Sequence, residues 1–171
     1  VIVLVHGYSG AWVRYKPVID RVPLDRFRVI AIDLRGAGES DKPASGYQMS
    51  DFSDDIAGLA RTLGLPKFIL VGHSMGGSIA YQFAVDHGDM LRGVIFVTPA
   101  PADGIEEPAE EMFADQARRK ADRAYSIEVE RKKTFYRPVP ADMAEQSATT
   151  LENSSEAFLR ESWDAMAKLR L

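Results

Sequence analysis

The segment VGHSMGGSIA, residues 71–80, places Ser74 between glycines, directly after an apolar run and directly before a run of small residues. A serine hydroxyl is barely ionised at neutral pH, so it attacks a carbonyl carbon only when a neighbouring base removes its proton. Gly72 and Gly76 complete the pattern Gly-X-Ser-X-Gly, in which a sharp strand-to-helix turn exposes the serine. The segment predicts Ser74 as a nucleophile, with His73 and the two glycines supporting the turn.

A second segment, HGYSG, begins at His6 directly after the apolar run 1–5. A nucleophile of this kind creates a negatively charged tetrahedral intermediate, which two fixed backbone N–H groups stabilise. Losing one such donor costs about 2.7 to 4 kcal/mol in other serine hydrolases. By itself a His-Gly pair after a strand is more often a plain turn. Together with the first segment, it predicts the N–H groups of Tyr8 and Met75 as the donors, with Gly7 shaping the loop.

The chain contains three histidines, and none of them is expected to be the base. His87 falls at the far end of the helix predicted after Ser74, about 20 Å away at 1.5 Å per residue. His73 adjoins Ser74 in a strained turn and is expected to point away from its hydroxyl. His6 lies nearer, but we expect it to hold its own loop by hydrogen bonding.

The elements that would position these residues alternate along the first part of the chain. Apolar, β-branched runs predict buried strands, and apolar residues at three- and four-residue spacing predict helices between them. The alternation predicts an α/β fold with a mostly parallel sheet and flanking helices. The predicted strands are 1–5, 27–33, 67–72 and 93–98, and the predicted helices are 50–65, 75–86 and, more weakly, 11–22.

No further strand is predicted after Pro101. We therefore expect a first region, 1–101, that carries the sheet and a second, 102–171, of helices broken at 137–140 and 152–155. Asn153, with Glu156 three residues later, resembles an N-terminal helix cap, and Pro140 suits a first helical turn. The second region is either a lid over the site or simply packing helices.

Three motifs in order, HGYSG, DLRGAGESDKP at 33–43 and GHSMGG, resemble the α/β-hydrolase superfamily, in particular its serine-nucleophile, esterase-like members with a helical lid. The resemblance implies that strand 1–5 lies beside strand 67–72. It also implies that the loop begun by Asp33 is structural, tied down by Arg35. The catalytic acid and histidine come later in such chains, so we expect both beyond Leu171, in a chain truncated at both ends.

The resemblance implies a serine hydrolase that acts on an ester, a lactone or a similar carbonyl compound. Relatives that act on epoxides or haloalkanes are assigned an aspartate nucleophile, whereas this chain has Ser74. Without its base, residues 1–171 alone are expected to be inactive. The alternative is a binding or receptor-type protein on the same fold with little turnover.

Composition limits the partners of the protein. The net charge of −4 argues against nucleic acid, and no apolar run is long enough to span a membrane. The absence of cysteine suits a cytoplasmic location. We expect no metal and no cofactor, and a small-molecule substrate that is partly apolar. Side chains that either line its pocket or pack in the core are Met112, Phe113, Tyr125, Phe135 and Trp163.

Overall fold

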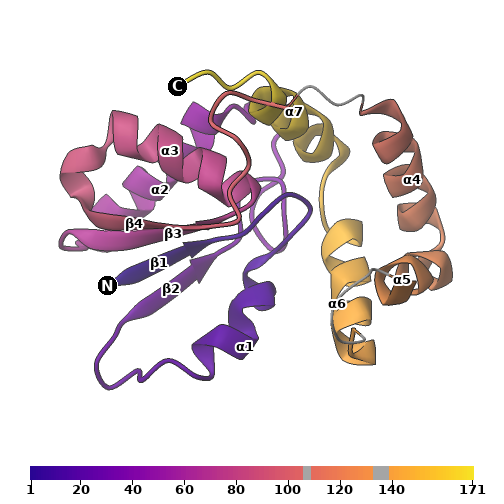
Figure 1. The fold of residues 1–171 in the computed structure, drawn as a ribbon, viewed down its shortest axis with the longest axis horizontal. Coiled ribbons are helices and arrows are strands. Elements are labelled where there is room, and N and C mark those ends of the chain that lie inside the picture. The colour runs from indigo at the N-terminus through magenta and orange to yellow at the C-terminus, as the bar shows by residue number, and fades with distance from the viewer. Residues whose placement is uncertain (106–108, 133–138) are drawn as a thin grey trace.

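The computed structural model describes residues 1–105, 109–132 and 139–171, and it contains one parallel sheet of four strands (Figure 1). The strand order is β2-β1-β3-β4, with β1 in contact with β3, as the resemblance implies. Val5 at the end of β1 lies opposite Gly72 in β3. The predicted α/β class is confirmed. The strands are β1 (Ile2–Val5), β2 (Val29–Ile32), β3 (Phe68–His73) and β4 (Leu91–Val97).

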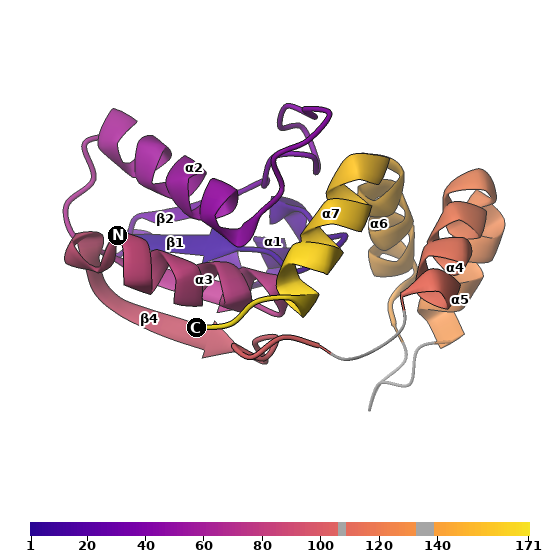
Figure 2. The same cartoon turned by 90° about the horizontal axis from the view of Figure 1, so that it is seen from above.

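Two helices lie together on one face of the sheet, α2 (Met49–Thr62) and α3 (Met75–Asp86) (Figures 1 and 2). α2 buries Phe52, Ile56 and Ala60, which follow one another at four-residue spacing on one face. Leu63, three residues after Ala60, is exposed, and the helix has ended before it.

The weakly predicted helix 11–22 is shorter than expected. It consists of a 3-10 turn, η1 (Trp12–Tyr15), followed by one turn of α-helix, α1 (Lys16–Ile19). Pro17 occupies the first turn of α1, where a missing N–H costs no helical hydrogen bond. This segment lies on the opposite side of the sheet from α2 and α3, below the strands in Figure 1.

Among the described residues after the sheet, the chain forms four helices, α4 (Glu110–Ala121), α5 (Arg123–Lys132), α6 (Ala141–Glu152) and α7 (Glu156–Ala167). Pro140 caps the start of α6, and the predicted break at 137–140 lies partly outside the described residues. The prediction for Asn153 is wrong. Asn153 ends α6, and Ser155 caps α7, because Ser155 has the extended backbone that lets its Oγ accept the N–H of Phe158 at 3.1 Å.

α7 shares the hydrophobic core of the sheet region, whereas α4, α5 and α6 stand at one end of the molecule (Figures 1 and 2). Phe158 is fully buried, and its ring packs edge-on against Tyr47 and Phe52. Gly36 makes this approach possible, since a Cβ there would lie 2.4 Å from the Cβ of Phe158. The N–H of Ser155 also donates to the carbonyl of Gly36.

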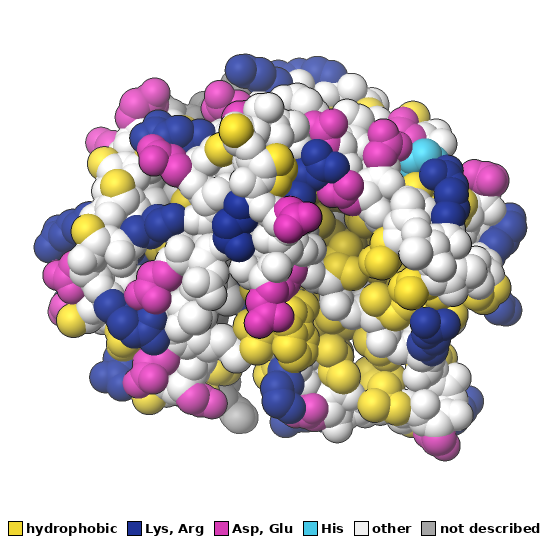
Figure 3. Space-filling model, turned by 180° about the vertical axis from the view of Figure 1, so that it is seen from behind, with side chains coloured by type: hydrophobic (Ala, Val, Ile, Leu, Met, Phe, Trp, Pro, Cys, Tyr) yellow, Lys and Arg dark blue, Asp and Glu magenta, His cyan; other side chains and the backbone are white. Residues whose placement is uncertain are grey.

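The outer strands of the sheet are β2 and β4. On β4, large apolar side chains are exposed at Ile95, Phe96 and Val97. Seen from behind, hydrophobic side chains gather over the sheet-containing half of the molecule, with charged side chains around them (Figure 3). Within the described residues, no helix is both long and apolar enough to cross a bilayer.

Candidate active site

Ser74 sits in the turn between β3 and α3, where it caps the helix with a backbone that L-residues rarely adopt (φ 53°, ψ −119°). Hydrogen bonds fix this turn to the chain after β4. The N–H of Ser74 donates to the carbonyl of Val97 at 3.2 Å, and its own carbonyl accepts from Gly77 at 2.8 Å and Ala100 at 3.0 Å. The predicted nucleophile is therefore held in a strained conformation by the structure around it.

The glycines around Ser74 lie where no side chain fits. A Cβ at Gly72 would be 2.2 Å from the carbonyl oxygen of Gly76, and a Cβ at Gly76 would be 2.3 Å from that of Val5. A Cβ at Gly77 would lie 2.4 Å from the Cβ of Pro99. Real Cβ atoms do not approach other atoms this closely, and backbone oxygens cannot move aside, so the turn depends on glycine at these positions.

The loop after β1 lies against Ser74. A Cβ at Gly7 would lie 3.0 Å from both the Cβ of Ser74 and the Nδ1 of His73. The loop turns back on itself, since the N–H of Gly10 donates to the carbonyl of Gly7 at 3.1 Å. Two segments that are far apart in the sequence, HGYSG and GHSMGG, thus meet at the carboxyl ends of β1 and β3, where ligands bind in open parallel sheets.

Backbone strain is concentrated at this end of the sheet. Among the described residues, the non-glycine residues with positive φ are Ser9, Ser74 and Thr98, and they follow β1, β3 and β4. Strain of this kind collects at functional sites, where surrounding contacts hold it in place. Sequence reasoning missed Ser9 and Thr98, because only the neighbouring Gly10 and Pro99 hint at tight turns there.

Of the predicted oxyanion donors, Tyr8 lies in the loop after β1 and Met75 is the first residue of α3. Met75 is fully buried and opens α3, so no helical carbonyl precedes it to accept its N–H. The side chain of Tyr8 points to the C-terminal helices: its hydroxyl donates to the carbonyl of Leu159 at 2.7 Å, and its ring packs against Trp163. Burial raises the pKa of this hydroxyl, so it stays protonated.

His6 holds its loop with both ring nitrogens. Nδ1 lies 2.8 Å from the carbonyl oxygen of Gly7, and Nε2 accepts the N–H of Leu34 at 3.1 Å. These partners require the neutral ring with its proton on Nδ1. Burial lowers the pKa of His6 to about 4, which keeps the ring neutral at physiological pH.

The other two histidines, His73 and His87, form no hydrogen bond with the hydroxyl of Ser74 among the described residues. His87 ends α3, and its Nε2 lies 2.8 Å from a carboxylate oxygen of Asp54 on α2. His73 is half-buried beside Gly7, and its pKa is lowered by burial and by the charge of Arg14. No histidine of this chain forms a hydrogen bond with the hydroxyl of Ser74 within the part of the chain that the structure describes.

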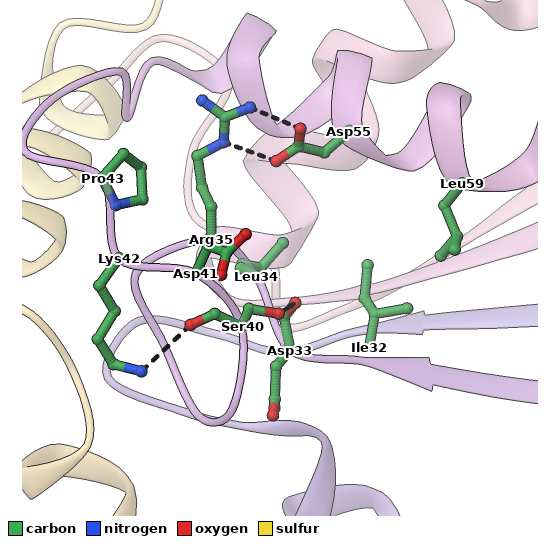
Figure 4. A pocket seen from close by; sticks show the side chains of 10 residues that line it. All are labelled: Ile32, Asp33, Leu34, Arg35, Ser40, Asp41, Lys42, Pro43, Asp55 and Leu59. Carbon is green, nitrogen blue, oxygen red and sulfur yellow. Dashed lines mark hydrogen bonds and ion pairs between the residues drawn. The ribbon is translucent and has the colours of Figure 1, made fainter.

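Asp33 and Arg35 brace the loop after β2. The carboxylate of Asp33 accepts the N–H groups of Trp12 at 2.7 Å and Glu39 at 3.0 Å. The guanidinium of Arg35 donates two hydrogen bonds, of 2.5 and 2.6 Å, to the carboxylate of Asp55 (Figure 4). These residues line an open cavity of about 860 Å³ beside β2, two strands away from the one that ends at Ser74. This cavity is therefore separate from the site around Ser74.

The side chains that were expected either to line an apolar pocket or to pack in the core lie in different surroundings. Trp163 packs against Tyr8, whereas Phe113 lies under the guanidinium of Arg160. Tyr125 donates its hydroxyl to Asp115 on α4 at 2.9 Å. Met112 is half-buried, and Phe135 lies outside the described residues. No cluster of three or more potential metal ligands occurs among the described side chains.

Comparisons with known proteins place this geometry in a family. The chain is 43% identical over 96 residues to a 2-(acetamidomethylene)succinate hydrolase of Mesorhizobium japonicum, covering 56% of this chain and 34% of the relative. It is 36% identical over 100 residues to a soluble epoxide hydrolase of a Corynebacterium species, covering 58% of this chain and 35% of the relative. The match thus spans about a third of the length of these relatives.

The fold of an esterase from Exiguobacterium antarcticum superposes with a TM-score of 0.84 at 24% identity, covering 99% of this chain and 66% of the esterase. A sequence model of the α/β-hydrolase fold matches residues 1–166. That match covers the strand-turn-helix around Ser74, the facing loop after β1 and the helices that follow the sheet, and with it the chain belongs to the α/β-hydrolase fold family.

Proposed function

We propose that the protein containing this chain is a serine hydrolase that cleaves an ester, a lactone or a similar carbonyl compound. The observation that carries the proposal is the strained backbone of Ser74, at the end of β3 and the start of α3, between glycines that no other residue can replace. Serine at this position supports acyl chemistry rather than epoxide opening, because the resemblance assigns an aspartate to epoxide hydrolases there.

In the proposed reaction, the Oγ of Ser74 forms a bond to the carbonyl carbon while a base takes the hydroxyl proton. The carbonyl π electrons move to oxygen, and the N–H groups of Tyr8 and Met75 donate hydrogen bonds to it. The bond to the leaving group then breaks, and the leaving group takes the proton from the base. Water attacks the acyl-enzyme in the same way and releases the acid and the free serine.

We propose that the base is none of the three histidines; His73 adjoins Ser74 in the strained turn and forms no hydrogen bond with its hydroxyl among the described residues. His6 uses both nitrogens in its own loop, and His87 is paired with Asp54. We therefore propose that the general base and its orienting acid lie outside residues 1–171, and that these residues alone turn over little substrate. We also propose a cytoplasmic location, which the absence of cysteine supports.

The division into a core, 1–101, and a helical lid, 102–171, stays a proposal. The contact of Trp163 with Tyr8 supports it, because it brings an apolar side chain of α7 to the predicted oxyanion loop. A partly apolar substrate would be covered by such a lid.

The test uses the natural full-length protein and a fluorophosphonate probe, which reacts covalently with activated serines. We expect the adduct on Ser74 by mass spectrometry. Ser74→Ala should lower the hydrolysis of p-nitrophenyl acetate by about 10³-fold or more. Ser50→Ala, which changes an exposed serine of α2, is the matched control and should react like the wild type. Labelling of another residue, or full activity of Ser74→Ala, would refute the proposal and favour a binding protein.

A further inference from the structure

A cavity of about 360 Å³ lies between α4 and α7. Its volume falls within the range of small-molecule sites, about 300 to 1,000 Å³. α4 lines it with Phe113, Gln116 and Lys120, among others, and α7 lines it with Leu159 and Arg160. The loops that meet at the serine turn contribute no residue to the lining that the structure describes. We call this space the α4–α7 cavity.

One part of the α4–α7 cavity is apolar. Phe113, Ala117 and Ala121 line it from α4 at four-residue spacing, which places them on one face of the helix. Leu159, which is buried, lines it from α7. The guanidinium of Arg160 lies 5.0 Å from the centroid of the Phe113 ring, within the distance at which a cation is attracted to a ring face. These side chains provide a surface for the apolar chain of a ligand.

A half-buried cation lies beside this apolar surface. The Nζ of Lys120 donates a hydrogen bond to the carbonyl of Ser154, which uses one of the three ammonium hydrogens. Among the described residues, Lys120 forms no ion pair. Burial lowers the pKa of its ammonium, and the carboxylate of Glu156 raises it. An ammonium that is partly removed from water and has hydrogens to donate favours a carboxylate ligand.

The start of α7 adds positive charge near Lys120. Ser154, which accepts from Lys120, directly precedes Ser155, the cap of α7. The N-terminal end of a helix carries a partial positive charge and stabilises anions. The one carboxylate on the described lining, that of Glu156, is exposed and accepts from the Nε of Arg160 at 3.0 Å. The surroundings of Lys120 therefore favour an anion.

We propose that the α4–α7 cavity is a binding site for a carboxylic acid with a medium-length alkyl chain, bound as its carboxylate. The carboxylate accepts hydrogen bonds from the Nζ of Lys120. The alkyl chain lies on Phe113, Ala117 and Leu159, where removal of apolar surface from water stabilises the complex. This site goes beyond the proposed hydrolysis and does not depend on it.

Tyr8 connects the α4–α7 cavity to the loop after β1. Its hydroxyl donates to the carbonyl of Leu159 at 2.7 Å and lies 3.1 Å from the Oε1 of Gln116, and both of these residues line the cavity. The backbone N–H of Tyr8 is the proposed oxyanion donor at the other end of the same residue. If esters are hydrolysed at Ser74 as proposed, the acids released belong to the class of ligand that the cavity accepts.

The test measures binding by isothermal titration calorimetry with the natural full-length protein. The probes are octanoate, octan-1-ol and octylammonium, which share the alkyl chain and differ in charge. We expect octanoate to bind about 10- to 100-fold more tightly than octan-1-ol, as one charge-assisted hydrogen bond provides. Octylammonium should bind more weakly than octan-1-ol, because its charge repels Lys120. Octanoate should bind equally well after Ser74 has been labelled with a small fluorophosphonate.

Two pairs of variants test the two parts of the cavity. Lys120→Met should lower the affinity for octanoate about 10- to 100-fold and leave that for octan-1-ol unchanged, whereas Lys120→Arg should keep most of the affinity for octanoate. Its control is Lys132→Met, which removes an exposed lysine of α5. Ala117→Leu should weaken both ligands about 10-fold or more by filling the cavity. Ala114→Leu, at an exposed position of α4 outside the lining, should weaken neither.

The outcomes distinguish this inference from the proposed hydrolysis. Octanoate binding that is lost in Lys120→Met and Ala117→Leu but kept in both controls supports the inference, provided that urea unfolding shows each variant to be folded. The inference is overturned if octanoate does not bind, if Lys120→Met binds it as tightly as the wild type, or if labelling of Ser74 blocks it. If the probe does not label Ser74, the proposed hydrolysis has failed, and the variants of Lys120 and Ala117 alone decide on the cavity.

Discussion

Replacing Ser74 by glycine should stabilise the protein while removing the proposed activity. The backbone of Ser74 has φ 53° and ψ −119°, a conformation that costs a residue with a Cβ about 1 to 3 kcal/mol. Glycine adopts it freely but loses about 0.5 to 1 kcal/mol more entropy on folding. Ser74→Ala is the reference, since it removes the same hydroxyl and keeps the Cβ. We therefore expect Ser74→Gly to be about 1 kcal/mol, and at most about 2.5 kcal/mol, more stable than Ser74→Ala.

The measurement is urea unfolding at pH 7, followed by tryptophan fluorescence. For a protein of this size, about 1 kcal/mol shifts the melting temperature by about 2 to 4 °C, so thermal unfolding serves as a second measure. The control is the same pair of substitutions at Glu145, which is exposed in the middle of α6. There, Glu145→Ala should be more stable than Glu145→Gly by about 1 kcal/mol.

We expect the difference in stability between the glycine and alanine variants to have opposite signs at positions 74 and 145. Neither Ser74→Gly nor Ser74→Ala should hydrolyse esters. Because both variants lose the hydroxyl and the activity, a difference between their free energies of unfolding reports on the backbone strain and not on catalysis. If glycine is less stable than alanine at position 74, as it should be at position 145, then Ser74 carries no strain and its backbone is not evidence for a functional turn.

Two further predictions concern the loop after β1. Tyr8→Phe removes the hydroxyl that donates to the carbonyl of Leu159, and it should leave most turnover intact. Tyr8→Pro removes the backbone N–H and should lower kcat about 10²- to 10³-fold. Equal losses of kcat in the two variants would mean that the hydroxyl or local folding matters instead. Burial lowers the pKa of His6 from 6.5 to about 4, so the unfolded chain binds the proton first as pH falls. The free energy of unfolding should therefore be fully retained above pH 6.5 and fall by about 3 kcal/mol between pH 6.5 and 4. His6→Gln should show a flatter dependence in urea unfolding; an equally steep one would exclude His6 as the cause.

The sheet could be predicted from the sequence because its strands are apolar runs, bounded by glycines and charged residues, and the helices between them require parallel pairing. The prediction that all four strands are buried holds for β1 and β3, whereas β2 is half-buried and β4 is exposed at its end. That β1 lies beside β3 was implied by the three motifs rather than by the runs themselves, and the rest of the strand order was not predicted. The close contacts of Gly72 and Gly76 also follow from the motif, because the Gly-X-Ser-X-Gly turn forces backbone segments together.

The contacts between the sheet region and the C-terminal helices could not be predicted. Arg14, in η1, donates a hydrogen bond to the hydroxyl of Ser147 on α6 at 2.8 Å. The two residues are far apart in the chain, and neither belongs to a motif. Periodicity shows which face of a helix is apolar but not which surface that face packs against. The packing of Tyr8 against Trp163 could therefore not be predicted either. The cap of α7 was misplaced because Asn153 and Ser155 are both good capping residues. Only the backbone angles decide between them.

The burial of Phe158 against Gly36 has a consequence for engineering this protein. The approach leaves no room for any other residue at Gly36, so α7 and the loop after β2 must be inherited together in any chimera. Among the described residues, α4 and α5 contribute no buried apolar side chain to that core, and the residues that they bury are Gln116, Ser126 and Glu130. These two helices are therefore the part that can be exchanged between relatives to alter substrate preference, with α7 kept as the fixed point of the graft.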